Sequence, residues 1–170
     1  LEKRFQTFNE KRIRLLDEMA ALEPGTLMAR PLPGKWSILE IVEHLVVAER
    51  VVFQDLPEPS QLKVREPRLK DRIRYLLVLF VLRTGIPVQA ASPAMLPQGG
   101  RELAELRRLW DENQSWLRAY IDSLGDEGSH RPALEHPVAG PISVRQAVAL
   151  SQVHLDRHIQ QIRALQRLLA

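Results

Sequence analysis

The chain has 170 residues, of which 45% are hydrophobic and 26% charged, a globular balance that is sufficient for one buried core. It has no cysteine, which excludes disulfides, thiolate nucleophiles and sulfur ligands to zinc. The net charge is only +3 and basic residues alternate with acidic ones, as in KRIRLLDE, so we expect a solvated surface and no nucleic-acid partner.

The most apolar run of the chain extends from Arg74 to Val88. Its apolar part is too short to cross a bilayer, because a spanning helix needs about 20 apolar residues. We therefore interpret this run as a buried segment and expect no membrane partner. The first twelve letters, LEKRFQTFNEKR, lack the apolar stretch of a signal peptide, so a cytoplasmic location is the default expectation.

Helical periodicity predicts two helices in the first third of the chain. Apolar residues recur at spacings of three, four and seven over residues 2–22, and Pro24-Gly25 is expected to end this helix. The second helix is predicted to begin at Ser37, because Glu40 follows three residues later and completes a capping box. It is expected to end before Pro57.

A long connection over residues 57–100 separates these helices from the next two. It contains a shorter apolar helix over residues 69–82 and is otherwise rich in proline, which indicates a surface loop. The third helix is predicted over residues 101–124. After a loop over residues 125–141, Ser143 is the predicted N-cap of a fourth helix that continues to the C-terminus.

No segment shows a convincing strand pattern, so the fold class predicted from these elements is all-α. We expect residues 1–170 to form a single domain, a four-helix bundle in which one long crossover joins the second and third helices.

Three histidines fall on helix faces that are expected to be buried. His154 and His158 are one turn apart in VHLDRHIQQI, on the apolar stripe of the fourth helix, and His44 lies on the inner stripe of the second. Buried imidazoles are costly unless their nitrogens find partners, and a metal ion can be a partner for all three. Three imidazoles with an open position would form a catalytic-type site for a divalent ion such as zinc or nickel. The alternative is that the protein core itself satisfies these histidines.

Two carboxylates lie close to these histidines in the sequence. Glu40, one turn before His44, could reach the site, but the capping role at Ser37 is the preferred interpretation. Asp156 is half a turn off the inner stripe, so we expect it to pair with Arg157 or Arg163 at the surface.

The remaining two histidines, His130 and His136, are in the predicted loop between the third and fourth helices. We expect them to be solvated or locally hydrogen-bonded, although His136 could border the mouth of the site. The chain has no Ser-His-Asp arrangement and no glycine-rich phosphate motif, so the sequence assigns no catalytic residue.

Two segments, GKWSILEIVEHLVVAER and EHPVAGPISVRQAVALSQVHLDRHIQQI, resemble the signature regions of the DinB/YfiT-like superfamily. The first contains a tryptophan-serine pair followed by glutamate and then histidine-leucine. The second has an HP-x-x-GP turn leading into a helix with two histidines and a trailing glutamine-isoleucine. The resemblance implies an up-down-down-up bundle and a divalent metal held by His44, His154 and His158. It also implies a homodimer.

Two functions follow as hypotheses. In the first, the protein is a metal-dependent enzyme for a small-molecule substrate. The resemblance favours transfer of a low-molecular-weight thiol over hydrolysis, and arginines near the pocket would bind a carboxylate. In the second, it is a stress-response or interaction protein whose histidine site is structural or vestigial, and a second subunit covers the apolar LLVLFVL segment.

Overall fold

In the computed structural model, the described residues 1–64, 68–84, 86 and 92–169 form six α-helices, two short 3-10 helices and one β-hairpin. In chain order these elements are α1 (Glu2–Ala20), α2 (Pro24–Met28), α3 (Ile38–Phe53), η1 (Pro59–Gln61), α4 (Leu69–Thr84), η2 (Pro93–Met95), α5 (Leu103–His130), β1 (Pro132–His136), β2 (Gly140–Ser143) and α6 (Val144–Leu169).

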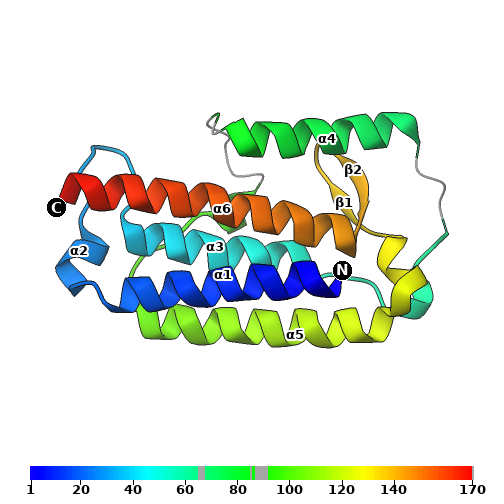
Figure 1. The fold of residues 1–170 in the computed structure, drawn as a ribbon, viewed down its shortest axis with the longest axis horizontal. Coiled ribbons are helices and arrows are strands. Elements are labelled where there is room, and N and C mark those ends of the chain that lie inside the picture. The colour runs from blue at the N-terminus through cyan, green and yellow to red at the C-terminus, as the bar shows by residue number, and fades with distance from the viewer. Residues whose placement is uncertain (65–67, 85, 87–91, 170) are drawn as a thin grey trace.

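Four long helices form the bundle. Figure 1 shows that α1 and α6 run in one direction, and that α3 and α5 run in the opposite direction. The order is therefore up-down-down-up, as predicted. Because α3 and α5 are parallel, the chain must return along the whole bundle between them, and the crossover that contains α4 makes this return.

Both helices that carry the three histidines begin at a capping box. The Ser37 hydroxyl accepts a hydrogen bond from the Glu40 backbone N–H at 3.2 Å, and the Glu40 carboxylate accepts one from the Ser37 N–H at 2.8 Å. Ser143 and Gln146 make the same reciprocal pair at the start of α6, at 3.3 and 2.9 Å. These pairs satisfy backbone donors that have no partner in the first helical turn, and they confirm both predicted starting points.

Two predicted helix ends differ from the structure. Pro24-Gly25 was expected to end the first helix, but α1 ends at Ala20 and Pro24 begins α2, because proline is well tolerated in a first helical turn. The third helix was expected to end at residue 124, but α5 continues to His130 beyond a kink at Gly125. There φ is 63°, a left-handed value that glycine adopts without strain.

The absence of strands was also predicted wrongly, because part of the expected loop over residues 125–141 forms an antiparallel hairpin of β1 and β2. The connection between the strands is closed by a side chain: His136 Nδ1 accepts hydrogen bonds from the N–H groups of Val138 and Ala139, at 3.1 and 3.0 Å. The strands are short and proline-containing, so no alternating pattern marked them in the sequence.

The apolar segment forms α4, as predicted, but the expectation that it is buried is wrong. Four large apolar side chains on one face are 54–61% exposed, namely Ile73, Leu76, Leu77 and Phe80. Figure 1 shows the reason: α4 lies outside the bundle, beside α6 and the hairpin, so that only its other face is covered. Within the part of the chain that the structure describes, no helix is long and apolar enough to cross a membrane.

The core has two apolar clusters, one toward each end of the bundle, and polar side chains lie between them. On α3, Val46 belongs to one cluster and Phe53 to the other, and the buried side chain of Glu49 lies between these two positions. Gln114 occupies the equivalent place on α5, between Trp110 and Leu117.

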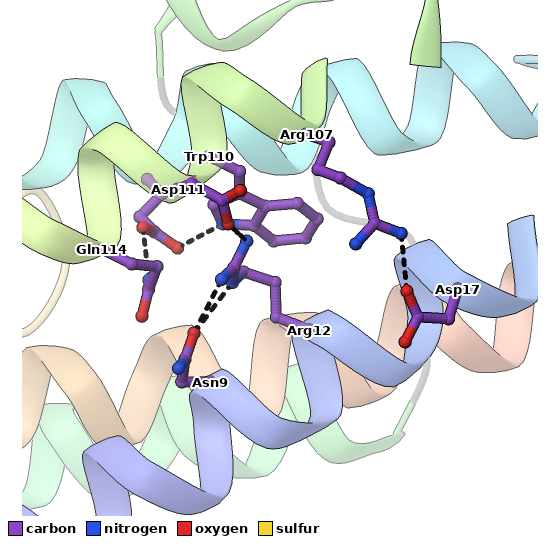
Figure 2. A network of polar contacts seen from close by, with 8 residues as sticks. Asn9, Arg12, Asp17, Arg107, Trp110, Asp111 and Gln114 are labelled. Atoms are coloured by element: carbon purple, nitrogen blue, oxygen red, sulfur yellow. Dashed lines mark hydrogen bonds and ion pairs between the residues drawn. The ribbon is translucent and has the colours of Figure 1, made fainter. Parts of the chain in front are cut away.

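Hydrogen bonds satisfy most of this buried network. Trp110 Nε1 donates to Glu49 at 2.8 Å and Gln114 Nε2 donates to it at 2.6 Å. Figure 2 shows Arg12, which is only 3% exposed, between Asn9 and Asp111; its guanidinium donates to both and lies 5.7 Å from the centre of the Trp110 ring. The network thus joins α1, α3 and α5 by directional contacts.

The buried network predicts a pH effect on stability. Burial is the largest cause of the shift in the pKa of Glu49 and raises it to about 7, against the opposing effects of Trp110, Gln114 and Arg12. Between the ordinary value and about 7, the folded protein holds a proton that the unfolded chain releases, so this contribution to stability falls as pH rises. We expect the difference in unfolding free energy between wild type and Glu49→Gln to fall by at most about 1.4 kcal/mol per pH unit in this window.

Urea unfolding at several pH values measures that difference. Glu18→Gln, on the exposed face of α1, is the matched control and should run parallel to wild type. A Glu49→Gln curve that is also parallel to wild type would show that Glu49 does not bind a proton on folding.

Candidate metal centre

Three imidazole rings meet between α3 and α6. His44 Nε2 is 3.3 Å from His154 Nε2, and His158 Nε2 is 3.0 Å from the same atom. The ring centroids are 4.5–5.2 Å apart. The structure therefore brings together the three side chains that the sequence analysis selected, which follows from their position on the inner faces of two neighbouring helices.

The other ring nitrogen of two of these histidines has a partner that can only accept. His44 Nδ1 is 2.7 Å from the backbone carbonyl oxygen of Met95, and His158 Nδ1 is 3.0 Å from Gln161 Oε1. A carbonyl or amide oxygen has no proton to donate, so in both rings Nδ1 carries the hydrogen. In a neutral imidazole this leaves Nε2 with a lone pair and no proton.

The lone pairs of His44 and His158 both face Nε2 of His154. Nε2 of His154 has at most one hydrogen. The three Nε2 atoms therefore have at most one hydrogen among them, so at least two lone pairs are directed at the same small space. A cation relieves this repulsion. Two imidazole nitrogens bound to one zinc ion are roughly 3.4 Å apart, close to the separations found here, so these residues fit a divalent metal.

Electrostatics keep these imidazoles neutral and able to bind a metal. Burial is the main cause in each case: it lowers the pKa of His44, lowers that of His154 well below its ordinary value, and lowers that of His158 to about 4. For His154 and His158 the charges of neighbouring histidines act in the same direction. Protons therefore compete weakly with a metal near neutral pH.

The surroundings of the site are apolar on one side. The ring of Trp36 lies 4.9 Å from that of His44, and His44 and His158 are only 5% and 7% exposed. His154 retains partial exposure. Two of the candidate ligands are thus held by packing as well as by their Nδ1 hydrogen bonds, a combination that fixes the ring orientations.

Glu40 takes the capping role that the sequence favoured. Its carboxylate accepts from the Ser37 backbone and forms an ion pair with Arg30, so both oxygens are engaged away from His44. This ion pair, followed by other hydrogen bonds, lowers the pKa of Glu40.

The expected pairing of Asp156 with Arg157 or Arg163 is wrong. Asp156 instead pairs with Lys11 of α1, at 2.6 Å. The partner is 145 positions away in the sequence, on a helix whose position relative to α6 only the fold determines.

The two remaining histidines are outside the three-histidine group, but neither is in a loop as expected, because His130 ends α5 and His136 ends β1. His136 closes the hairpin turn and is not part of the three-histidine group. His130 is exposed, and its Nε2 accepts from Arg145 at 3.0 Å. The long crossover does contribute to the site, through the carbonyl oxygen of Met95.

Sequence reasoning did not select Met95, and it noted Gln161 only as the glutamine of the trailing glutamine-isoleucine pair, without assigning it a role. Met95 acts through its backbone, so the identity of its side chain gives no signal. Gln161 gives one: it lies three residues after His158, a helical spacing at which side chains meet.

Comparison with known proteins agrees with this fold. The sequence profile described as the DinB superfamily matches residues 7–162. The uncharacterized protein YuaE of Bacillus subtilis (strain 168) is 26% identical over 160 residues, which cover 93% of this chain and 94% of YuaE. The structure of YfiT from Bacillus subtilis, described as a probable metal-dependent hydrolase with an unusual four-helix bundle topology, superposes with a TM-score of 0.63 at 19% identity. The match covers 98% of this chain and 85% of YfiT.

The hydrogen bond to His158 predicts a change in metal affinity. Replacing Gln161 by leucine removes the acceptor that holds the Nδ1 hydrogen, and losing such a partner typically weakens metal binding by about tenfold to a hundredfold. We expect the dissociation constant for zinc to rise by that factor in Gln161→Leu, measured by competition with a chromophoric chelator. The control is Gln160→Leu, because the adjacent residue is exposed and should leave the affinity unchanged. Equal affinity in the two variants would contradict the assigned role.

Proposed function

Since the chain belongs to the DinB superfamily, we propose that it is a metal-dependent enzyme in which His44, His154 and His158 hold a divalent ion, zinc or nickel. The observation that supports this most strongly is the meeting of three Nε2 atoms. In His44 and His158, Nδ1 donates its hydrogen to an acceptor oxygen, so Nε2 has a free lone pair. The absence of a carboxylate from this ligand group, within the described residues, matches a catalytic-type site of three imidazoles.

A divalent ion at this position would act as a Lewis acid that activates a water or thiol nucleophile and polarises the electrophile. The residues of the chain supply the rest. Met95 and Gln161 hold the ring hydrogens on Nδ1, and Trp36 shields one side of His44 from water. His154, which is partly exposed, marks the side from which a substrate would approach.

We propose a small-molecule substrate and two reactions that differ in the nucleophile. Thiol-dependent transfer uses a low-molecular-weight thiol, an expectation from the family resemblance. Hydrolysis uses water, and the description of YfiT as a probable metal-dependent hydrolase supports this reaction for the present chain. The same three-histidine site serves both, so one screen covers them.

Removing and restoring the metal tests the enzyme proposal. We expect the apo protein to lose thiol-transfer or hydrolytic activity on electrophilic and ester probes, and zinc or nickel to restore it, while the helical circular dichroism spectrum persists. His154→Ala should bind less than about a tenth of the metal of wild type, because one of three ligands is lost. His130→Ala, outside the site, is the control and should bind metal normally. A large fall in melting temperature on chelation, with no activity in any metal form, would contradict the proposal and favour a structural ion.

A second candidate function has support from α4. Ile73, Leu76, Leu77 and Phe80 recur at the spacing of one helix face and are exposed to solvent in the single chain. We propose that a second copy of the chain covers this face with its own α4, packed antiparallel. Around a two-fold axis the same apolar stripe of each copy packs against that of the other. A homodimer could also be an enzyme. If the protein has no catalytic activity, the α4 face would instead be the working surface of an interaction protein.

Light scattering on a sizing column measures the oligomeric state. We expect a dimer for wild type and a monomer for the double variant Leu76→Ser/Phe80→Ser, which removes apolar area from both copies. Leu168→Ser is the matched control, since Leu168 is equally exposed (57%) but lies at the end of α6. A monomeric wild type would rule out the dimer.

A further inference from the structure

Arg157 has an unsatisfied guanidinium nitrogen and is on the helix that carries His154 and His158. The residue is on α6, three positions after His154 and immediately before His158. Its Nη2 donates to the backbone carbonyl oxygen of Ile86 at 2.7 Å, whereas Nη1 is buried and has no hydrogen-bond partner. A buried donor of a charged group without a partner is costly, so an acceptor is expected at this position.

The positive charge of Arg157 acts on the histidine cluster. Arg157 is three positions after His154 on α6, a helical spacing at which side chains are neighbours. The guanidinium is therefore close enough to add to the potential that a ligand would meet at the site.

The carboxylates near this part of the chain are engaged elsewhere. Asp156, the immediate neighbour of Arg157, pairs with Lys11. Glu43 of α3 pairs with Arg101 at 2.7 Å, and its other oxygen accepts from the Gly99 N–H at 2.9 Å. No carboxylate among the described residues forms an ion pair with Arg157.

A divalent ion on three neutral imidazoles would add two positive charges to that of Arg157, and the ligand group supplies no negative charge. Such a site discriminates strongly in favour of anions.

We propose that Arg157 is a substrate-binding residue that holds an oxyanion, a carboxylate or phosphate group of the substrate, on Nη1 while the reacting group lies at the three histidines. This inference rests on the proposed function and narrows its substrate class to small anionic molecules. An exclusively structural role, in which Arg157 anchors the crossover at Ile86, uses Nη2 alone and leaves the buried Nη1 unexplained.

Protein loaded with Co²⁺ tests the inference without an activity assay, because ligands at the metal change its visible absorption. Three probes are titrated: mercaptoacetate, 2-mercaptoethanol, which has the same thiol without the carboxylate, and inorganic phosphate. The proteins are wild type, Arg157→Gln, Arg157→Lys and Arg163→Gln, the last a control at an exposed arginine of the same helix. Circular dichroism verifies folding, and Arg157→Lys, which keeps the charge, serves if Arg157→Gln does not fold.

We expect wild type and Arg163→Gln to bind mercaptoacetate about tenfold or more tightly than 2-mercaptoethanol, because one hydrogen bond between charged groups raises the affinity by about that factor. Arg157→Gln should lose this preference, and Arg157→Lys should retain only part of it. Phosphate binding should weaken in the same order.

Three outcomes would overturn the inference: a preference of the same size in wild type and both Arg157 variants, equal binding of the two thiols by wild type, or no binding of any probe by wild type. If phosphate binds through Arg157 but neither thiol changes the spectrum, the inference stands for phosphate-bearing substrates, and binding of these two thiols to the metal is excluded. If both thiols bind equally, the metal site stands and the role of Arg157 does not.

Discussion

The constraint on which this structure depends is the position of two hydrogens. The Met95 carbonyl oxygen and Gln161 Oε1 can only accept, so they hold the Nδ1 hydrogens of His44 and His158 and leave lone pairs on both Nε2 atoms. Those lone pairs face His154 at 3.0 and 3.3 Å. Without a cation this is a cluster of acceptors in a buried place, and with one it is a set of three ligands.

The bundle topology makes this arrangement possible. Since α3 and α5 are parallel, the chain has to cross the length of the bundle between them, and the crossover brings η2 against α3, where the Met95 carbonyl meets His44. Capping boxes at Ser37 and Ser143 fix where α3 and α6 begin. The same crossover places Ile86 at Arg157, so one connection contacts both a candidate ligand and the proposed anion-binding residue.

Features that depend on local periodicity were predictable from the sequence. His44, His154 and His158 are on the apolar faces of their helices, which was enough to predict that they meet in the interior, and the serine caps marked two helix starts. Features that depend on distant segments were not: the contact of Met95 with His44 spans 51 positions. The exposure of α4 was missed for a related reason. An apolar run indicates that burial is favourable, but it does not show whether the same chain or another molecule covers the run.

X-ray absorption spectroscopy of the zinc-loaded protein tests the central claim most directly, because it counts the imidazoles bound to the ion. The account predicts three histidine nitrogens at about 2.0–2.1 Å, with further light-atom ligands completing the shell. A spectrum with fewer than three imidazoles would contradict it, as would a shell made up of carboxylate oxygens. In that case the three histidines are a feature of the core and not a metal centre.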